Sequence, residues 1–120
     1  MKSAGVPTST DAIAPPVEHL ANRLDDVVHQ RFRLGILAFL SAVESVEFTT
    51  LRKSLSLTDG NLNRHLAILS DAGFVAIDKP TETGRRARTW VHMTATGRSA
   101  LAAHVTALRE MLANVDRATD

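Results

Sequence analysis

The stretch LTDGNLNRHLAILSDAGFV, residues 57–75, begins with polar side chains. Such side chains are suited to hydrogen bonding with the donors and acceptors along a planar edge, such as that of a nucleic-acid base. Asn can pair two-fold with adenine and Arg with guanine, and each pairing is worth about 1–3 kcal/mol of discrimination between bases. Gly60 keeps the segment slim enough for close approach to another molecule. The residues that we expect to make such contacts are Thr58, Asp59, Gly60, Asn61, Asn63 and Arg64.

The same stretch also fits a plainer interpretation, in which the polar side of a surface helix simply faces water. That alternative accounts equally well for any one of these residues. Asp59 is repelled by phosphates, although it suits a helix N-terminus and can accept a hydrogen bond from cytosine. Leu62, Leu66 and Leu69 recur at i, i+4 and i+7 and supply an apolar stripe. The sequence therefore predicts a helix with one buried face and one polar face.

A second group of charged residues lies between Lys79 and Arg98. This window holds five cations and the single anion Glu82, a balance of +4 within a chain of formal net charge +1. Cations at a loop tip suit a DNA minor groove or a phosphate path, where neutralised phosphates release counterions. A solvated hairpin tip that resists aggregation would explain the loop alone. The residues predicted to contact the DNA backbone here and on the preceding helix are Thr49, Thr50, Arg52, Lys53, Arg85, Arg86 and Arg88.

Apolar periodicity places these residues on a series of short elements. Residues 1–16, rich in Ser, Thr, Ala, Gly and Pro, predict a flexible tail, and residues 17–120 predict one domain. Thr49 or Thr50, Thr58 and Thr94 are the expected helix N-caps, and Gly73 is the expected helix end. The predicted elements are a first helix from Val17 to Val28, a core helix with Phe32, Ile36, Phe39, Leu40 and Val43 on one face, a short extended piece at Val46–Phe48, a helix with Leu51 and Leu55, a helix at 58–72, two strands at 74–79 and 88–93 joined by the basic loop, and a helix at about 94–115.

Composition limits the size and chemistry of the protein. With 120 residues, of which 44% are hydrophobic, the chain can bury one modest core. It has no cysteine, so packing alone must hold the fold. The apolar run LGILAFL at 34–40 is far shorter than the roughly 20 residues of a membrane span, and Lys2 is followed by no apolar signal region. We expect a cytoplasmic protein.

The terminal helix carries a narrow, heptad-like apolar seam. Its apolar positions step by four and three residues, a spacing typical of helices that pair with other helices. Burial against the first helix of the same chain is the alternative, and we expect both helices to contribute to an interface between two copies. The interface residues predicted are Leu20, Leu24, Leu101, Val105, Leu108, Leu112 and Val115.

The order of elements is that of a winged helix-turn-helix, a mostly α fold with a small β-hairpin, whose second helix enters the major groove. The blocks LTDGNLNRHL and RTWVHMTATGRSAL, within a similarity over roughly residues 24–113, resemble winged helix DNA-binding regulators related to the MarR and ArsR groups. The resemblance implies a homodimeric transcriptional regulator that binds double-stranded DNA. It implies a recognition helix at 58–72, a wing at 80–87 and a terminal helix that pairs subunits.

The sequence contains little that indicates an enzyme. The sequence has no glycine-rich phosphate loop, no metal-binding spacing and no nucleophile motif, so we expect no catalytic residue, no metal and no cofactor. Asp25, Asp26 and His29 could bind a metal or sense pH, although an ion-paired helix end is the commoner role of such a trio. His65 is expected to pack or to donate to a phosphate, whereas His19, His92 and His104 are expected on the surface, and Trp90 and Phe74 in packing. The alternative function is a winged helix that binds another protein and no DNA.

Overall fold

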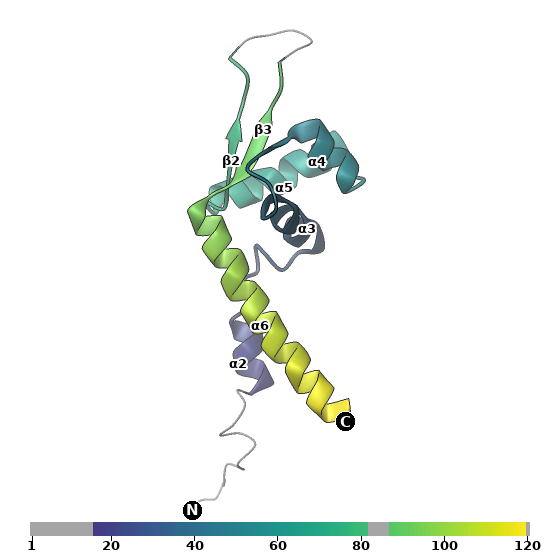
Figure 1. Ribbon diagram of the computed structural model, residues 1–120, viewed down its shortest axis with the longest axis vertical. Helices are drawn as coiled ribbons and strands as arrows, with labels where there is room; N and C mark the ends of the chain where they lie inside the picture. The colour runs from purple at the N-terminus through teal and green to yellow at the C-terminus, as the bar shows by residue number, and fades with distance from the viewer. Residues whose placement is uncertain (1–15, 82–86, 120) are drawn as a thin grey trace, which may run out of the picture.

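The computed structural model describes residues 16–81 and 87–119, and these form a helical body with a small sheet and one long terminal helix (Figure 1). Apart from Pro16, which precedes the first helix, the predicted tail lies outside the described residues. No helix of the described part is long and apolar enough to cross a membrane. The elements in chain order are α2 (Val17–Asn22), α3 (Arg31–Leu40), β1 (Val46–Glu47), α4 (Phe48–Ser54), α5 (Asp59–Asp71), β2 (Val75–Asp78), β3 (Trp90–Met93) and α6 (Ala95–Thr119).

The sheet is antiparallel and has the strand order β1-β3-β2. Val91 of the central strand lies opposite Val46 on one side and Ile77 on the other, and it is fully buried. The predicted hairpin is therefore confirmed. The short extended piece predicted at Val46–Phe48 becomes a third strand over its first two residues, because pairing with β3 satisfies its backbone.

Helices α3, α4 and α5 pack against this sheet around one hydrophobic core. Leu62, Leu66 and Leu69 are each no more than 1% exposed, which confirms the predicted stripe of α5. Gly35 lets α3 approach the end of α4, since a Cβ atom at that position would lie 3.2 Å from Leu55 Cδ2. The core therefore fixes the orientation of α5 and leaves its other side free.

A tight turn joins α4 to α5, as a helix-turn-helix requires. Ser56 adopts a left-handed backbone conformation with φ of 54°. The chain then turns back, so that the Leu57 amide donates to the Arg52 carbonyl at 3.1 Å and the Leu57 side chain enters the core. Thr58 caps α5 as predicted, its hydroxyl oxygen accepting from the Asn61 amide at 3.1 Å.

The end of α5 is fastened to the start of α6. The Gly73 amide, at φ of +81°, donates to the Ser70 carbonyl at 2.9 Å, and the Phe74 amide donates to the Leu69 carbonyl at 2.9 Å. These two hydrogen bonds are the pattern of a Schellman motif. Thr94 caps α6 by accepting from the Gly97 amide at 2.9 Å and donates to the Gly73 carbonyl at 2.6 Å. Both predicted helix ends, the glycine stop and the threonine cap, are confirmed.

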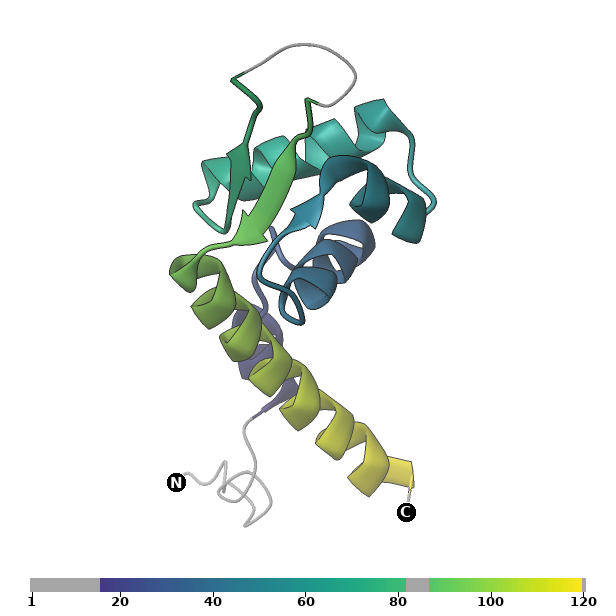
Figure 2. The same cartoon turned by 45° about the horizontal axis from the view of Figure 1, so that its top comes forward.

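Helix α6 extends from this junction away from the sheet, and α2 lies beside it in both views (Figures 1 and 2). It runs four residues beyond the predicted end at 115. We refer to α2 and α6 together as the arm, and to α3–α5 with the sheet as the body.

Three local predictions are wrong. The first helix ends at Asn22 instead of continuing to Val28, because the Asp25 side chain accepts from the amides of Val27 and Val28 and turns the chain. Helix α4 begins at Phe48, so neither Thr49 nor Thr50 is its N-cap; the preceding residue, Glu47, is held in the sheet. Val43 lies beyond the end of α3 and is 37% exposed.

Candidate nucleic-acid interface

Helix α5 presents its polar residues to solvent. Asn61, Asn63 and Arg64 are all exposed, on the side opposite the buried leucine stripe. The Arg64 Nη2 atom donates to the Asn61 Oδ1 atom at 3.4 Å, which brings a guanidinium and an amide side by side. This face therefore offers neighbouring donors and acceptors on a rigid helix.

Asp59 is paired with a cation from the preceding helix. Its Oδ1 atom lies 2.9 Å from Arg52 Nε, and Arg52 Nη1 also donates to the Leu57 carbonyl at 3.4 Å. The ion pair offsets the negative charge that would otherwise oppose a phosphate at the start of α5. Asp59 and Arg52 thus brace the turn between the two helices.

His65 lies on α5 beneath the polar face. It is only 7% exposed, its ring lies 5.8 Å from that of Phe32, and its Nδ1 atom lies 3.4 Å from Arg33 Nη1. Burial, followed by the charges of Arg33 and Arg64, lowers the pKa of His65. Of the two predicted roles, packing agrees with this position and phosphate donation does not.

The β2–β3 hairpin stands beside α5. Arg88 forms an ion pair with Glu47 of β1, which holds the base of the hairpin against the edge strand. Trp90 is 42% exposed on the hairpin, so its predicted packing role is only partly realised, whereas Phe74 is buried as predicted. Arg85 and Arg86 lie outside the described residues, and their predicted role stays a prediction.

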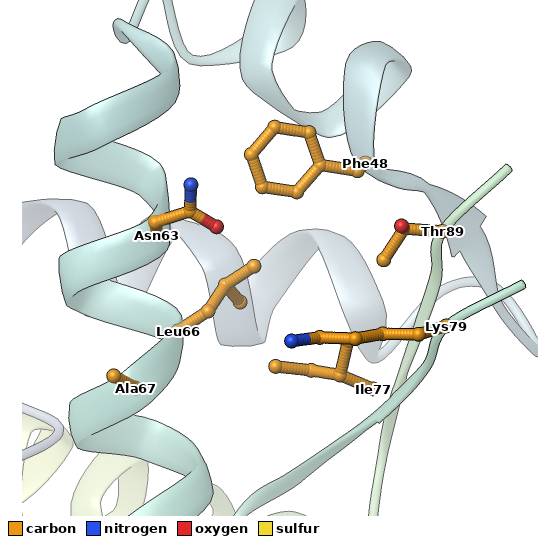
Figure 3. A pocket seen from close by; sticks show the side chains of 7 residues that line it. All are labelled: Phe48, Asn63, Leu66, Ala67, Ile77, Lys79 and Thr89. Carbon is orange, nitrogen blue, oxygen red and sulfur yellow. The ribbon is translucent and has the colours of Figure 1, made fainter.

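A hollow of about 330 Å³ separates α5 from the hairpin (Figure 3). Its apolar lining comes from Leu66 and Ala67 of α5, Ile77 of β2, and Phe48. Three polar side chains complete the lining: Asn63, Lys79 and Thr89. In the view of Figure 3, Asn63 stands on the helix side, opposite Lys79 on the hairpin side.

The sequence does not predict Lys79 and Thr89 as site residues. Lys79 adds to the charge of the basic window, but that charge does not place it beside α5. Thr89 gives no signal in the sequence, because only the folded structure shows that it lines the same hollow as Lys79. Thr49, Thr50 and Lys53, predicted to hold phosphates, are exposed on α4.

The seven predicted interface residues fall into two groups. Leu20 is fully buried and Leu101 is 9% exposed, both within the single chain, while Leu24, Val105 and Leu108 are half-buried. Leu112 and Val115, near the end of α6, are 61% and 56% exposed. Contact of α2 with α6 thus consumes one part of the seam and leaves the other part open.

The trio that might have bound a metal is used differently. Asp25 and His29 join a hydrogen-bonded network with His104 of α6, and Asp26 is exposed. Among residues 16–81 and 87–119, no group of three His, Asp or Glu side chains is arranged to hold a metal ion. His104 is only 1% exposed, so its predicted surface position is wrong.

A helix-turn-helix with a β-hairpin beside its second helix defines the class: this is a winged helix. The chain belongs to the winged helix DNA-binding domain family, whose sequence model matches residues 32–112. It is 37% identical, over 84 residues, to the uncharacterized protein MJ0432 of Methanocaldococcus jannaschii, a match that covers 70% of this chain and 90% of that protein.

Solved structures place the chain in the same class. The structure of a transcriptional regulator homologue from Pyrococcus horikoshii OT3 superposes with a TM-score of 0.74 and 29% identity, covering 82% of this chain and 98% of that one. AbsC, a MarR family transcriptional regulator from Streptomyces coelicolor, shares the fold with a TM-score of 0.58 at 18% identity, covering 82% and 70% of the two chains. The chain therefore has the winged helix-turn-helix fold that the sequence predicts, and a MarR family regulator shares this fold.

Proposed function

We propose that the chain is a homodimeric transcriptional regulator that binds duplex DNA in a sequence-specific manner, with α5 in the major groove and the hairpin at the adjacent minor groove or backbone. The observation that carries this proposal is the exposed polar face of α5 beside a hairpin from the most basic part of the chain. Winged helices use the second helix of the motif in this way.

Base recognition is assigned to the polar face of α5. Asn61, Asn63 and Arg64 project donors and acceptors, and amide and guanidinium groups pair two-fold with purine edges. Gly60 is exposed and has open space around it, so the start of the helix can approach a base edge closely. Thr58 and Asp59 shape that start by capping it and by pairing with Arg52.

The hollow between α5 and the hairpin receives the DNA backbone. If the helix lies in the major groove and the hairpin lies at the minor groove, the sugar-phosphate strand that divides those grooves must pass between them. Lys79 supplies a cation for a phosphate there, and the apolar lining suits a deoxyribose. Thr49, Thr50 and Lys53 on α4, with Arg85, Arg86 and Arg88 on the hairpin, supply further backbone contacts.

Pairing of two copies is assigned to the arm. The exposed Leu112 and Val115 continue the seam of α6, and the exposed Val17 lies on the neighbouring α2. A two-fold protein matches a two-fold operator. The buried Leu20 and Leu101 support the arm from within each chain.

The test is a salt titration of binding to the duplex upstream of the protein's own gene. Replacement of Arg64 by Ala should cost about 1–3 kcal/mol and relax sequence preference, because it removes a base contact. Replacement of Lys79 by Ala should weaken binding to all sequences alike and lower the salt slope by about 1, because it removes a phosphate contact.

Arg117→Ala is the matched control, since Arg117 is exposed near the far end of α6. It should leave both the affinity and the salt slope unchanged. Absence of binding to any duplex at low salt would contradict the proposal and favour the alternative, a winged helix that binds another protein and no DNA.

A further inference from the structure

The loop 23–30, which joins α2 to α3, runs between the arm and the body. On the arm side it is fastened to His104 of α6. On the body side it is fastened to Arg33 of α3, which in turn lies against His65 of α5. His104 is 1% exposed and His65 is 7% exposed. The proposed function uses neither ring, so their burial calls for a separate explanation.

His104 is held in one neutral tautomer. The Asp25 backbone N–H donates to His104 Nδ1 at 3.1 Å. A backbone amide can only donate, so Nδ1 carries no proton and the ring hydrogen must sit on Nε2. His104 Nε2 in turn lies 3.0 Å from His29 Nδ1, which must accept that hydrogen. The His104 ring is therefore uncharged in the folded arrangement.

A proton added to the His104 ring breaks this chain of hydrogen bonds. A second proton on His104 would go to Nδ1 and oppose the Asp25 amide hydrogen. The ring centroids lie 5.0 Å apart, so two charged rings would also repel each other.

The second fastening obeys the same rule. Arg33 Nε donates to the Val27 carbonyl of the loop at 2.6 Å, and Arg33 Nη1 lies 3.4 Å from His65 Nδ1. A guanidinium can only donate, so His65 Nδ1 accepts and the neutral ring carries its hydrogen on Nε2. A proton on Nδ1 would place two cations against each other within the body, but the bond from Arg33 to Val27 of the loop does not involve the His65 ring.

The charged groups around each ring act in known directions. Burial, followed by the neighbouring His29, lowers the pKa of His104, and the carboxylate of Asp25 opposes this shift. Burial, then Arg33 and Arg64, lowers the pKa of His65. Arg23 and Glu110, which form a 2.8 Å ion pair between the loop and α6, add a contact that involves neither ring.

We propose that loop 23–30 is a proton-sensitive joint, in which protonation of His104 releases the loop from α6 and loosens this contact between the body and the arm. The regulating ligand is the proton itself. Because the arm is the proposed dimer element and the body is the proposed DNA-binding element, loosening the joint would weaken two-site DNA binding in acid. That last step rests on the proposed function, whereas the joint itself does not.

The sign of the pH dependence follows from the lowered pKa values. Near pH 6.5, the ordinary pKa of histidine, the closed joint binds fewer protons at His104 than the opened loop does. The joint is therefore fully closed above about pH 6.5 and opens as the pH falls toward the pKa of His104 in the closed state. Within that window the opening constant should rise by about tenfold per pH unit.

The first test is nuclear magnetic resonance of the full chain between pH 7.5 and 5. We expect the His104 nitrogens to report a hydrogen on Nε2 at pH 7.5 and the ring to titrate below 6.5. The protection of the Asp25 amide against hydrogen exchange, corrected for intrinsic exchange, should fall over the same pH range. The proposed joint would be contradicted by a hydrogen on His104 Nδ1. It would also be contradicted if the protection of the Asp25 amide stayed constant while His104 titrates.

Matched variants distinguish the effect of protonating His104 from the effect of protonating other histidines. His104→Asn places an amide oxygen where Nδ1 stood, so it keeps an acceptor for Asp25 but cannot be charged near neutral pH. It should flatten the pH dependence of Asp25 protection, whereas His19→Gln, on the exposed face of α2, should leave that dependence as in the native chain. If His104→Asn fails to fold, the tautomer and the protection of the native chain decide.

DNA binding provides a second, separate experiment. The native chain should lose more affinity between pH 7.5 and 5.5 than His104→Asn does, and the two should bind equally at pH 7.5. Equal losses in both chains would overturn the regulatory part of the proposal. Failure of both chains to bind duplex DNA at every pH contradicts the proposed function alone. The protection of the Asp25 amide then decides whether the loop is a proton-sensitive joint.

Discussion

Helices α5 and α6 both carry apolar residues at helical spacing, yet the single chain buries them to different extents. The stripe of α5 is completely buried, and the exposed side chains at the start of α5 are polar: Asn61, Asn63 and Arg64. Further along α5, Ile68 is 36% exposed. The seam of α6 is buried or half-buried as far as Leu108, and its last two positions, Leu112 and Val115, are exposed.

The difference indicates two kinds of partner. At the start of α5 the apolar stripe is already buried and the exposed side chains are polar, so a partner at that end of α5 must be polar. A helix with open leucine and valine side chains gains free energy when those side chains leave water. The partner of α6 must therefore be apolar, and a second copy of the same seam satisfies that requirement.

Replacing one leucine by alanine in each helix should show the difference between α5 and α6 most strongly. Leu62→Ala removes a fully buried side chain of α5 and should lower the free energy of unfolding by about 2–5 kcal/mol. Leu112→Ala, in a side chain that is 61% exposed, should change the stability of the dilute monomer by no more than about 0.5 kcal/mol. Urea unfolding at low protein concentration measures both.

Association should show the opposite order. In a two-fold interface Leu112→Ala removes apolar contact from both copies, at about 1.5 kcal/mol each. The dimer should then dissociate about a hundredfold more readily, as measured by analytical ultracentrifugation. Ala103→Ser, on an exposed part of α6 away from the seam, is the control. A native chain that stays monomeric at high concentration would contradict the role given to the arm.

A smaller effect should sharpen the comparison at the start of α5. A Cβ atom added at Gly60 meets nothing within 4 Å, so Gly60→Ala should fold normally and gain up to about 1 kcal/mol of stability. If α5 lies against base edges, the added methyl group should nevertheless weaken DNA binding. Higher thermal stability with unchanged DNA affinity would show that Gly60 does not approach the DNA closely.

Much of the body could be predicted because its signals are local. The leucine stripe, the Thr58 cap and the Gly73 stop together define α5, and each depends on residues within a few positions of one another. The hairpin and the Thr94 cap are equally local. The third strand, by contrast, depends on β3 approaching Val46 from 45 residues further along the chain, which the sequence of that segment does not reveal.

The errors also arise from long-range contacts. The periodicity of Leu20, Leu24 and Val28 fits a continuous helix, but Asp25 turns the chain and His104 of α6 accepts from its amide. The sequence of α6 predicts a surface position for His104, because that helix alone gives no reason to bury a histidine. Its partners come from a loop about 80 residues earlier. The hollow beside Lys79 likewise exists only after α5 and the hairpin have met.

The central claim is that α5 binds the major groove of DNA, and a footprint on the duplex upstream of the protein's own gene tests it most directly. We expect two protected major-groove segments with centres roughly 10–10.5 base pairs apart, or a multiple of that spacing, because a two-fold protein presents two copies of α5. Arg64→Ala should lose this protection at concentrations where Arg117→Ala retains it. No protection at low salt, or protection that survives Arg64→Ala unchanged, would contradict the account.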